Sequence, residues 1–558
     1  MVDPKMIQWR RWERQAFEES RQSRKPILLS ISATWCHWCH QMDKDNYEDP
    51  ETAALINERY IPVRVDADRR PDVNERYNQG GWPSTVFLDT QGEVITGATY
   101  VPPATFRNAL RQVSQEFSSG IVRAEQISGP ETRVEEAKPE GKLEDVVARE
   151  LSIISRSFDD MFGGFGNAPK FPAPDAVELA LLAWRKTGKT EYELVARKTL
   201  DGMINIFDKE DGGFFRYATR REWVAPHYEK LLETNAQLLR LYSLAFSVTE
   251  NREYEETAKG TARFIEDWLF DKQFWASMDA DEEYYQSDDR ERMPPPSVDK
   301  VAFADLNGIA ACCFLDASVW LGNSQLERHA YTTLDNCLQS LVSSDGKVAH
   351  FSGESPSGML ADQAWLSLAC LRAFEQNAPQ KTLYLNSARR IIGWALANLS
   401  GDRAFYGDLG LEISGERTKP MDDNAAFCNA LLKLAHIDGR EELVGKAENA
   451  LREFSGSFTL YGPHAASYAL AVYQLRNSFD VTLVDVGGQE KSLLREALRL
   501  FEPAKTIVPL NMKDDMVAAR GYPQKAACYV CGSGLCLTAG DGPELQQHAA
   551  KLAKLDLP

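Results

Sequence analysis

The sequence predicts a multidomain protein, with an α/β domain at its N-terminus and an all-α domain of repeated helical hairpins after it. A length of 558 residues is too great for one ordinary core, and 43% hydrophobic with 26% charged residues is typical of globular domains. The first part of the chain alternates short apolar runs with helical text around a Cys-X-X-Cys motif. The later part repeats pairs of amphipathic helices.

The charge, the hydropathy pattern and the cysteine content exclude several classes of protein. A net charge of −19, from 82 acidic against 63 basic side chains, disfavours nucleic acid and anionic membranes as partners. The first residues are polar, and no segment offers about 18 uninterrupted apolar residues, so we expect a cytoplasmic protein that does not span a membrane. Ten cysteines are too sparse for a disulfide scaffold.

The N-terminal elements follow in a recognisable order. KPILLSIS (residues 25–32) reads as a buried strand that ends just before the cysteines, and YIPVRVDAD (60–68) reads as a second strand. Helical text lies between them, broken at Asp49-Pro50. GGWPSTVFLDTQGEVITG (80–97) predicts a hairpin with its turn at residues 90–92. Strand, helix, strand and hairpin, with Cys-X-X-Cys where the first strand meets its helix, is the thioredoxin order.

The position of the two cysteines predicts thiol chemistry. Cys36 would stand at a helix N-terminus, where unpaired backbone N–H groups favour the thiolate. Cys39, one turn later, could attack a mixed disulfide formed at Cys36 and release the reduced partner. Pro83 would be the cis-proline opposite the pair. The predicted catalytic set is therefore Cys36, Cys39 and Pro83.

Other interpretations of CHWCH (36–40) stay open. The letters match the c-type haem attachment pattern, but nothing in the sequence signals export, where that chemistry normally occurs. Zinc is disfavoured because His37 and His40 adjoin the cysteines, whereas structural sites take a second ligand pair from a distant segment. The cysteines could also stay reduced and idle in a packed helix. We expect neither a metal nor another cofactor.

Residues 121–141 are poor in apolar side chains and read as a linker, and residues 142–475 read as about six helical hairpins. Several inner helices start with a polar residue, at Asn235, Asn307, Asp362 and Asn424. Six hairpins closed into a ring would form an (α/α)6 toroid with a funnel at one end. The fold class is thus a thioredoxin-like α/β domain (1–120) followed by an (α/α)6 toroid.

Loops between the hairpins concentrate aromatic and acidic side chains, a mixture that suits a sugar. Loop acids are more often solvated or helix caps, so each candidate competes with a purely structural role. The candidates for a second site in the funnel are His227, Glu229, Asp279, Asp281, Asn307 and Asp422.

The C-terminal segment, residues 476–558, contains a strand at FDVTLVDVGG and three cysteines, Cys528, Cys531 and Cys536. No obvious strand-to-helix junction precedes these cysteines, which favours a structural or accessory role over a second redox motif. We expect the segment to close or extend the toroid.

The motifs WCHWCH, GGWPSTVFL, GGFGNAPKFP, PHYEKLLETNAQLLRLY and YVCGSGLC together resemble the family that fuses a thioredoxin-like domain to a six-hairpin-glycosidase-like toroid, the spermatogenesis-associated protein 20-like family with its DUF255-type domain. The resemblance implies both folds but no settled reaction. It maps the family's cysteine pair onto Cys36 and Cys39, its proline onto Pro83, and its Asp-Ala-Asp onto Asp279 to Asp281.

Three functions remain from these observations. The favoured one is a thiol-disulfide oxidoreductase acting on a protein disulfide or a small-molecule thiol, with the toroid binding a substrate. The second is a carbohydrate-active enzyme, an epimerase, isomerase or hydrolase, regulated by the thioredoxin-like domain. The third is a non-catalytic scaffold.

Overall fold

The computed structural model describes residues 6–120, 141–353, 355–410, 417–485 and 491–555. It divides into two compact units. The first contains Met1–Glu136, Met278–Asp299 and Asp408–Thr418; the second contains Ala137–Ser277, Lys300–Gly407 and Lys419–Pro558. The predicted linker, residues 121–141, lies outside the described residues except for Gly141.

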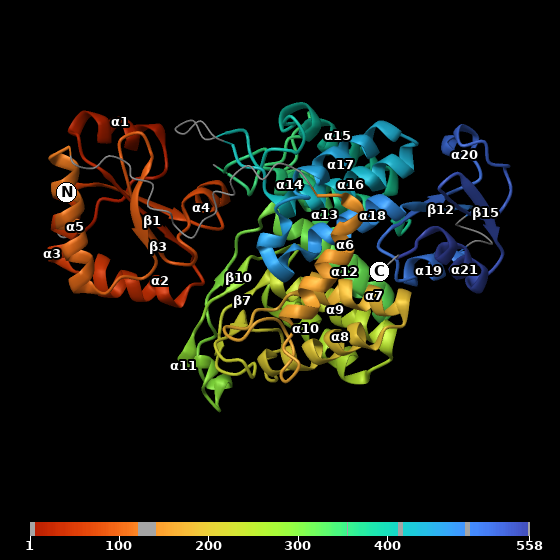
Figure 1. The fold of residues 1–558 in the computed structure, drawn as a ribbon, viewed down its shortest axis with the longest axis horizontal. Helices are drawn as coiled ribbons and strands as arrows, with labels where there is room; N and C mark the ends of the chain where they lie inside the picture. The colour runs from red at the N-terminus through yellow and green to blue at the C-terminus, as the bar shows by residue number, and fades with distance from the viewer. Residues whose placement is uncertain (1–5, 121–140, 354, 411–416, 486–490, 556–558) are drawn as a thin grey trace. The chain divides into compact units, whose positions relative to one another are not determined.

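The first unit is built on a four-stranded sheet in the order β2-β1-β3-β4 (Figure 1). β1 runs parallel to β2 and antiparallel to β3, and β3 pairs antiparallel with β4. The strands are β1 (Ile27–Ser32), β2 (Ile61–Asp66), β3 (Ser84–Leu88) and β4 (Val94–Ala98). The helices are α1 (Arg14–Ser23), α2 (His37–Met42), α3 (Pro50–Arg59), α4 (Pro71–Tyr77) and α5 (Pro103–Ser118), with a π-helical turn at Asp43–Tyr47. The thioredoxin-like fold predicted from the sequence is confirmed.

The break between the helices after β1 is encoded locally. The Asp49 carboxylate accepts hydrogen bonds from the backbone N–H of Thr52 at 2.9 Å and from its hydroxyl at 2.7 Å, which caps α3. Pro50 occupies the first turn, where its missing N–H costs nothing. Asp49 and Pro50 therefore end one helical stretch and start the next, as predicted.

The second unit contains a closed ring of six inner helices. In ring order each inner helix packs against the next, and the last, α18, packs against the first, α7. The inner helices are α7 (Pro174–Thr187), α9 (Leu232–Thr249), α12 (Ala304–Leu321), α14 (Leu360–Glu375), α16 (Met421–Asp438) and α18 (Ala466–Asn477). Small residues permit the close approach: a Cβ on Gly308 would lie only 2.6 Å from the backbone of Trp365 on the neighbouring helix. The predicted toroid is confirmed.

The outer helices are amphipathic and alternate with the inner ones along the chain. They are α6 (Leu143–Ser157), α8 (Thr190–Met203), α10 (Arg252–Trp268), α13 (Ser324–Ser340), α15 (Lys381–Asn398) and α17 (Glu441–Glu453). The chain enters the unit through an outer helix, α6, whose partner is the last inner helix, α18. The sixth hairpin is therefore made from the two ends of the helical region.

The polar residues at the heads of inner helices hold the preceding loops in place. The side-chain amide of Asn307 accepts from the backbone N–H of Phe274 at 2.8 Å and donates to the backbone carbonyls of Phe274 and Phe303. Asn235 makes the same bracket with Phe214, and Asn424 makes it with Phe405. These contacts satisfy backbone groups that burial would otherwise leave unpaired.

Helix α14 departs from that pattern. Its fourth residue is Gln363, and with the amide oriented to suit its neighbours this side chain brackets Gly346 and Val348. Asp362, one position earlier, is therefore not the equivalent of the asparagines. It faces a histidine, which is described with the site.

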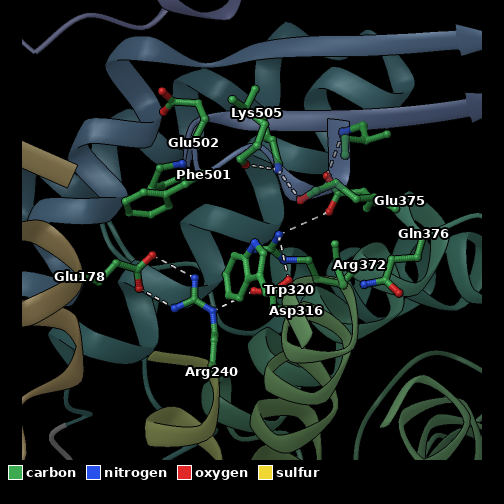
Figure 2. Close-up of a pocket in the computed structure, with 15 residues that line it drawn as sticks. Glu178, Arg240, Asp316, Trp320, Arg372, Glu375, Gln376, Phe501, Glu502 and Lys505 are labelled. Carbon is green, nitrogen blue, oxygen red and sulfur yellow. Dashed lines mark hydrogen bonds and ion pairs between the residues drawn. The ribbon is translucent and has the colours of Figure 1, made fainter. Parts of the chain in front are cut away.

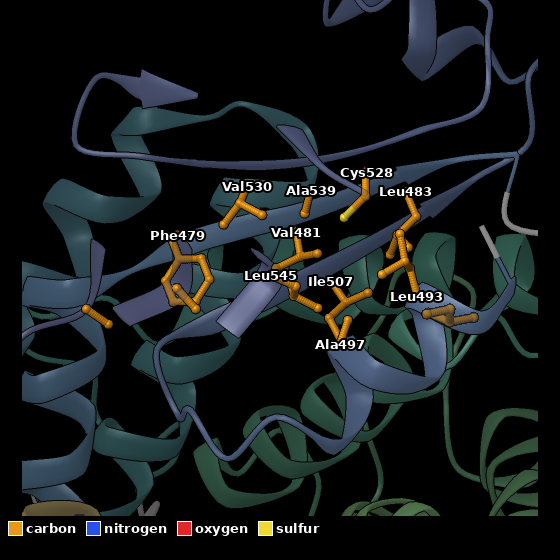
Figure 3. Close-up of a cluster of buried hydrophobic side chains, with 13 residues drawn as sticks. Phe479, Val481, Leu483, Leu493, Ala497, Ile507, Cys528, Val530, Ala539 and Leu545 are labelled. Carbon is orange, nitrogen blue, oxygen red and sulfur yellow. The ribbon is translucent and has the colours of Figure 1, made fainter. Parts of the chain in front are cut away.

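The C-terminal part of the second unit forms its own four-stranded sheet, in the order β13-β12-β14-β15. The strands are β12 (Phe479–Val484), β13 (Lys505–Leu510), β14 (Ala527–Gly532) and β15 (Leu535–Ala539), and the helices are α19 (Lys491–Arg499), α20 (Asp515–Ala519) and α21 (Gly542–Leu552). Figure 3 shows the buried cluster of this layer, in which Phe479, Val481 and Ile507 pack with α19 and α21 side chains.

This C-terminal layer repeats the topology of the N-terminal sheet. β12 runs parallel to β13 and antiparallel to β14, and β14 pairs antiparallel with β15. The order of elements along the chain is similar, down to the final helix after the hairpin, except that α2 and α3 lie between β1 and β2 where α19 is the described helix between β12 and β13. The segment expected to close or extend the toroid is thus a second α/β layer with the strand order and directions of the thioredoxin-like sheet.

The remaining elements are short pieces in the loops between hairpins. They are β5 (Tyr217–Ala218), β6 (Pro226–His227), β7 (Lys230–Leu231), β8 (Phe270–Asp271), β9 (Gln273–Phe274), β10 (Ser277–Met278), β11 (Val298–Asp299), α11 (Glu282–Tyr285), and 3-10 turns at Ile204–Ile206, Arg290–Arg292 and Phe458–Ala465. Within the described residues, one helix, α12, has the length and apolar composition of a membrane span, and 72% of that stretch is buried in the ring.

Candidate functional sites

The Cys-X-X-Cys motif lies where strand β1 passes into helix α2. Cys36 is the N-cap of α2, and its Sγ accepts a hydrogen bond from the backbone N–H of Cys39 at 3.2 Å. Both side chains are almost fully buried, at 3% and 2% exposure, and both are thiols. A sulfur that accepts an N–H bond at a helix start is better able to carry negative charge.

The second thiol has a different electrostatic environment. The hydrogen bond with Cys36 raises the pKa of the Cys39 thiol well above its ordinary value, and burial raises it further. Cys39 therefore keeps its proton at neutral pH in the reduced pair. The two sulfurs therefore differ: Cys36 Sγ accepts a backbone N–H, whereas Cys39 stays a protonated thiol.

Two tryptophans join the motif to the turn that contains Pro83. The peptide bond between Trp82 and Pro83 is cis, as predicted. The Trp82 ring packs edge-on against Trp35, with 5.5 Å between centroids, and the Trp35 indole N–H donates to the Asp68 carboxylate at 2.7 Å. The Trp-Pro junction thus lies beside the residue that precedes Cys36, the placement that a thioredoxin-like site requires.

A segment from much later in the chain contributes carboxylates to this unit. Asp299 accepts a hydrogen bond from the Thr34 hydroxyl at 3.1 Å and pairs with the Arg69 guanidinium at 3.0 Å. Asp279 lies 3.9 Å from Nδ1 of His40. Two of the predicted funnel residues are thereby relocated: Asp279 and Asp281 belong to the first unit, with the cysteine motif, and the Asp281 carboxylate accepts the Tyr284 N–H as the N-cap of α11.

The toroid has a buried cluster that the sequence did not reveal. Nδ1 of His350 lies 2.9 Å from Asp362 Oδ1 and 3.9 Å from Asp305 Oδ1. The same Asp362 oxygen accepts the backbone N–H of Asp305 at 3.2 Å. His350 and Asp362 are essentially inaccessible, at 2% and 0% exposure, while 19% of the Asp305 side chain remains exposed.

Asp305 is the member of this cluster that is poised to exchange a proton. Its carboxyl lies deep enough among protein atoms that burial raises its pKa to about 6, even though the neighbouring His350 acts in the opposite direction. A carboxyl near neutrality, a histidine and a second carboxylate can act as a general acid and base. Their ligand atoms also lie within 4.8 Å of one another, close enough to hold a divalent cation.

Acidic residues recur at the same end of the ring. Five of the six inner helices have one in the first turn: Asp175, Glu233, Asp305, Asp362 and the pair Asp422 and Asp423. Burial and repulsion from Glu178 raise the pKa of Asp175 to about 7. The Ser467 hydroxyl of α18 donates to Asp422 at 2.7 Å, which ties two neighbouring helix starts together. The N-terminal ends of the inner helices thus form an acidic opening.

The remaining predicted residues divide between this unit's loops and its framework. The His227 ring stacks on Tyr217 with 4.5 Å between centroids, and its Nδ1 lies 3.7 Å from the nearly inaccessible Glu229 carboxylate. Tyr217 in turn stacks on Phe171, which is exposed. Asn307 is not retained as a ligand-binding candidate, because its amide is occupied by backbone groups on both sides.

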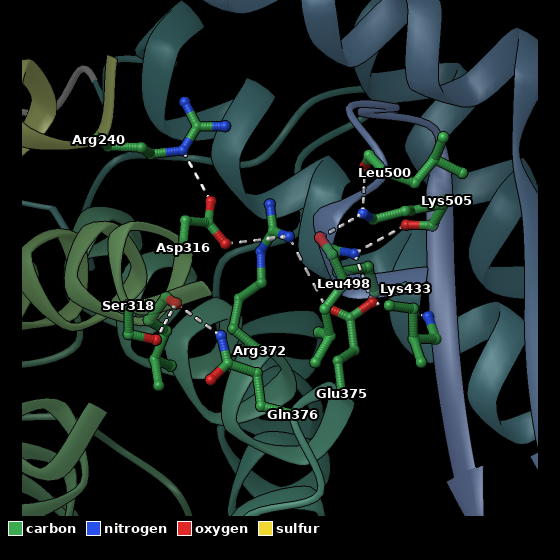
Figure 4. A network of polar contacts seen from close by, with 12 residues as sticks. Arg240, Asp316, Ser318, Arg372, Glu375, Gln376, Lys433, Leu498, Leu500 and Lys505 are labelled. Atoms are coloured by element: carbon green, nitrogen blue, oxygen red, sulfur yellow. Dashed lines mark hydrogen bonds and ion pairs between the residues drawn. The ribbon is translucent and has the colours of Figure 1, made fainter. Parts of the chain in front are cut away.

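A pocket in the second unit, lined by inner helices and residues 498–507, is filled with paired charges (Figure 2). Arg240 pairs with Glu178 and with Asp316, whose other oxygen lies 3.6 Å from Arg372. Figure 4 follows the chain of contacts onward. It passes to Glu375 and then to Lys433, which pairs with Glu375 at 2.7 Å.

The network reaches the C-terminal layer through Lys505. Its ammonium donates to the carbonyls of Ala497 and Leu498 at the end of α19, and burial lowers the pKa of Lys505 to about 7. Glu375 also accepts the backbone N–H of Ile507 at 2.9 Å. Most of these charges are paired with one another, so we assign this pocket to the framework that joins the ring to the C-terminal sheet.

Comparison with known proteins agrees with this architecture. Residues 2–132 match the family model Thioredox_DsbH, described as a protein of unknown function, DUF255. The observed thioredoxin-like domain and helical toroid agree with a resemblance to spermatogenesis-associated protein 20. The human spermatogenesis-associated protein 20 is 31% identical over 306 residues, which are 49% of this chain and 39% of that protein. The match thus spans well under half of the length of that relative.

Two shorter similarities are to proteins of different kinds. The thiol:disulfide interchange protein DsbD of Vibrio vulnificus is 26% identical over 102 residues, 17% of each chain. The cellobiose 2-epimerase of Bacteroides fragilis is 33% identical over 84 residues, 15% of this chain and 21% of that protein. Among solved structures, the cellobiose 2-epimerase of Spirochaeta thermophila superposes with a TM-score of 0.49 at 13% identity, covering 67% of this chain and 98% of that one.

Sequence patterns indicate the residues of this cluster only weakly. Asp305 stands two positions before the predicted Asn307, and His350 is one of eight histidines, in a short loop twelve residues before Asp362. Neither spacing is a motif. Only the packing of α14 against α12 brings the three side chains together.

Proposed function

We propose that the N-terminal unit is a thiol-disulfide oxidoreductase, with Cys36 as the nucleophile and Cys39 as the resolving thiol. The observation that carries the proposal is the asymmetry of the pair: Cys36 Sγ accepts the Cys39 N–H at 3.2 Å, whereas the pKa of Cys39 is raised by the same partner. A similarity of 26% over 102 residues to the interchange protein DsbD supports it. The substrate would be a protein disulfide or a low-molecular-weight disulfide.

The chemistry balances without a cofactor. The Cys36 thiolate attacks one sulfur of the substrate disulfide, and the other substrate sulfur departs as a thiolate. Cys39 then attacks the Cys36 sulfur of the mixed disulfide, its proton passes to a departing thiolate, and the second substrate sulfur is released. Two electrons have moved from the Cys36/Cys39 dithiol to the substrate, and an external dithiol must restore the pair.

The test is an exchange assay on the full chain with a glutathionylated peptide as substrate. We expect Cys36→Ser to reduce the rate at least about 1,000-fold and Cys39→Ser to trap a mixed disulfide. A variant with Cys337→Ser, a buried thiol of the toroid, is the matched control and should keep the wild-type rate.

An equilibrium titration in glutathione buffers completes the test. A reversible two-electron couple between about −120 and −270 mV, the span of thioredoxin-like enzymes, supports the proposal. Exchange that persists in Cys36→Ser, or a pair that never closes, would reject it.

A second candidate function is acid-base chemistry on a carbohydrate in the toroid. The Asp305, His350 and Asp362 cluster favours it, because it places a carboxyl with a pKa of about 6 beside a buried histidine at the acidic opening of the ring. The short similarity to a cellobiose 2-epimerase agrees with it. The N-terminal unit would then regulate the toroid or act independently.

A panel of sugars in deuterated buffer, followed by NMR, tests this candidate. Epimerisation or isomerisation would introduce deuterium at the reacting carbon, whereas hydrolysis would release a new reducing end. We expect His350→Gln and Asp305→Asn to lose turnover, with His227→Ala as a probe of the aromatic loop. Absence of both binding and turnover across the panel would eliminate the candidate.

A further inference from the structure

The C-terminal layer contains a disulfide between two neighbouring strands. Cys531 of β14 and Cys536 of β15 lie directly opposite each other in the antiparallel register, and their sulfurs are bonded. The other eight cysteines are thiols, and all are buried. One disulfide in a chain that otherwise keeps its cysteines reduced is typical of an exchangeable cross-link rather than of a structural scaffold.

The two cysteine residues differ in accessibility. β15 is the edge strand of its sheet, and Cys536 on it is exposed, together with Leu535 and Thr538. Cys531 is partly covered. Since exchange requires a thiolate to approach along the S–S axis, Cys536 is the sulfur that an incoming thiolate can reach.

The covered sulfur has a hydrogen-bonding partner that suits a leaving group. The Tyr522 hydroxyl lies 3.4 Å from Cys531 Sγ, and the Tyr522 ring is held by stacking on Tyr529 with 4.3 Å between centroids. Burial raises the pKa of Tyr522, so the hydroxyl keeps its proton at neutral pH and can donate to the sulfur. A donated hydrogen bond stabilises a thiolate and makes it leave faster.

We propose that Cys531–Cys536 is a second thiol-disulfide exchange site, at which an external dithiol of thioredoxin type attacks Cys536 and expels Cys531 as a thiolate. The attack forms a mixed disulfide between the dithiol and Cys536. The second thiol of the reductant then breaks it, releasing Cys536 as a thiol and closing the reductant's own disulfide. Two electrons pass to the hairpin, and oxidised glutathione would return it to the cross-linked form.

The site lies outside the machinery proposed for Cys36 and Cys39 and does not require it. After the cross-link opens, the edge strand stays joined to β14 by the turn at Ser533-Gly534, by its ladder hydrogen bonds and by the buried Ala539, so reduction would loosen the hairpin near Cys531 and Cys536. The hairpin would thus respond to the ratio of reduced to oxidised dithiol in its surroundings.

The test uses the full chain with Cys36→Ser and Cys39→Ser, which removes the first pair from the measurement. Dithiothreitol is the probe dithiol, and reduction of the hairpin is followed by alkylation and mass spectrometry, with near-ultraviolet circular dichroism to show that the chain stays folded. We expect second-order reduction in the native state, and reoxidation by oxidised glutathione. Cys528, buried in the same layer, should remain unlabelled throughout.

Two tyrosine variants test the role of the hydroxyl. Tyr522→Phe keeps the stacked ring but removes the donor, and should slow reduction roughly fivefold. Tyr529→Phe removes a hydroxyl from the other ring of the stack and should leave the rate unchanged.

Reduction that occurs only with global unfolding, or a reduced pair that oxidised glutathione cannot close, would overturn the proposal. Equal rates for the two tyrosine variants would overturn the leaving-group assignment. Neither result would bear on Cys36, because the first pair is absent from the measurement.

Discussion

The N-terminal and C-terminal sheets share one topology but place their cysteines differently. In the first, the pair follows the central strand β1, at the start of α2. In the second, the central strand β12 is followed by no cysteine, and the pair lies on the β14–β15 hairpin at the sheet edge. A shared topology therefore does not transfer the site: the residues at each strand end decide where thiol chemistry can occur.

The first residue of the outer parallel strand differs as well. Ile61 opens β2, whereas Lys505 opens β13 and is held by the carbonyls at the end of α19. At this position the N-terminal layer has a buried apolar side chain, and the C-terminal layer has a buried lysine. Four measurements test these differences between the two layers.

The largest difference should be in thiol reactivity. In the reduced chain at pH 7.5, we expect iodoacetamide to label Cys36 at least about 100-fold faster than Cys39, because the raised pKa of Cys39 keeps it protonated. Labelling is resolved by mass spectrometry of the peptides, with Cys528 of the C-terminal core as the unreactive reference. Equal labelling of Cys36 and Cys39 would contradict the assigned asymmetry.

Two glycine variants compare packing around the hairpins. A Cβ on Gly532 would lie 2.8 Å from Phe479 Cβ, so Gly532→Ala should destabilise the C-terminal layer by about 2 kcal/mol. A Cβ on Gly97 would meet only the flexible end of Gln79, so Gly97→Ala should cost the N-terminal layer less than about 1 kcal/mol. Hydrogen exchange of peptides from each sheet measures both, and a larger loss for Gly97→Ala would refute the comparison.

The cross-link should contribute to the stability of one layer only. Replacing Cys531 and Cys536 together by alanine should lower the free energy of unfolding of the C-terminal layer by about 2 kcal/mol relative to the oxidised chain. Under reducing conditions the variant and the wild type should be equally stable. The exposure of Cys528 to pulse alkylation in urea reports this layer, and a difference that survives reduction would contradict the expectation.

The smallest effect is a pH dependence of the C-terminal layer. Folding lowers the pKa of Lys505 from 10.5 to about 7, so above pH 7 the unfolded chain binds more protons than the folded one. The free energy of unfolding should therefore rise with pH, by about 1 kcal/mol between pH 7 and 8 relative to Lys505→Met. The same urea and alkylation measurement at both pH values checks this prediction. If the difference in unfolding free energy between the wild type and Lys505→Met does not change with pH, the effect assigned to the buried lysine is wrong.

The sequence alone predicted elements whose causes are local. Strand β1, the helix break at Asp49-Pro50, the Trp-Pro junction and the position of Cys36 follow from apolar runs and the restricted backbone of proline. The polar residues at the starts of the inner helices could be predicted as well, but the backbone groups to which they hydrogen-bond could not. These features need only a few neighbouring residues.

Which distant side chains meet depends on long-range packing and could not be predicted from the sequence. The tertiary structure moved Asp279 and Asp281 into the unit of the cysteine motif, gathered Asp305, His350 and Asp362 from two helices and a loop, and paired Cys531 with Cys536 across two strands. It also showed the second sheet, because strand order depends on pairings between segments far apart in sequence. The physical reason is that local propensity sets each element, whereas register and packing across the chain set its neighbours.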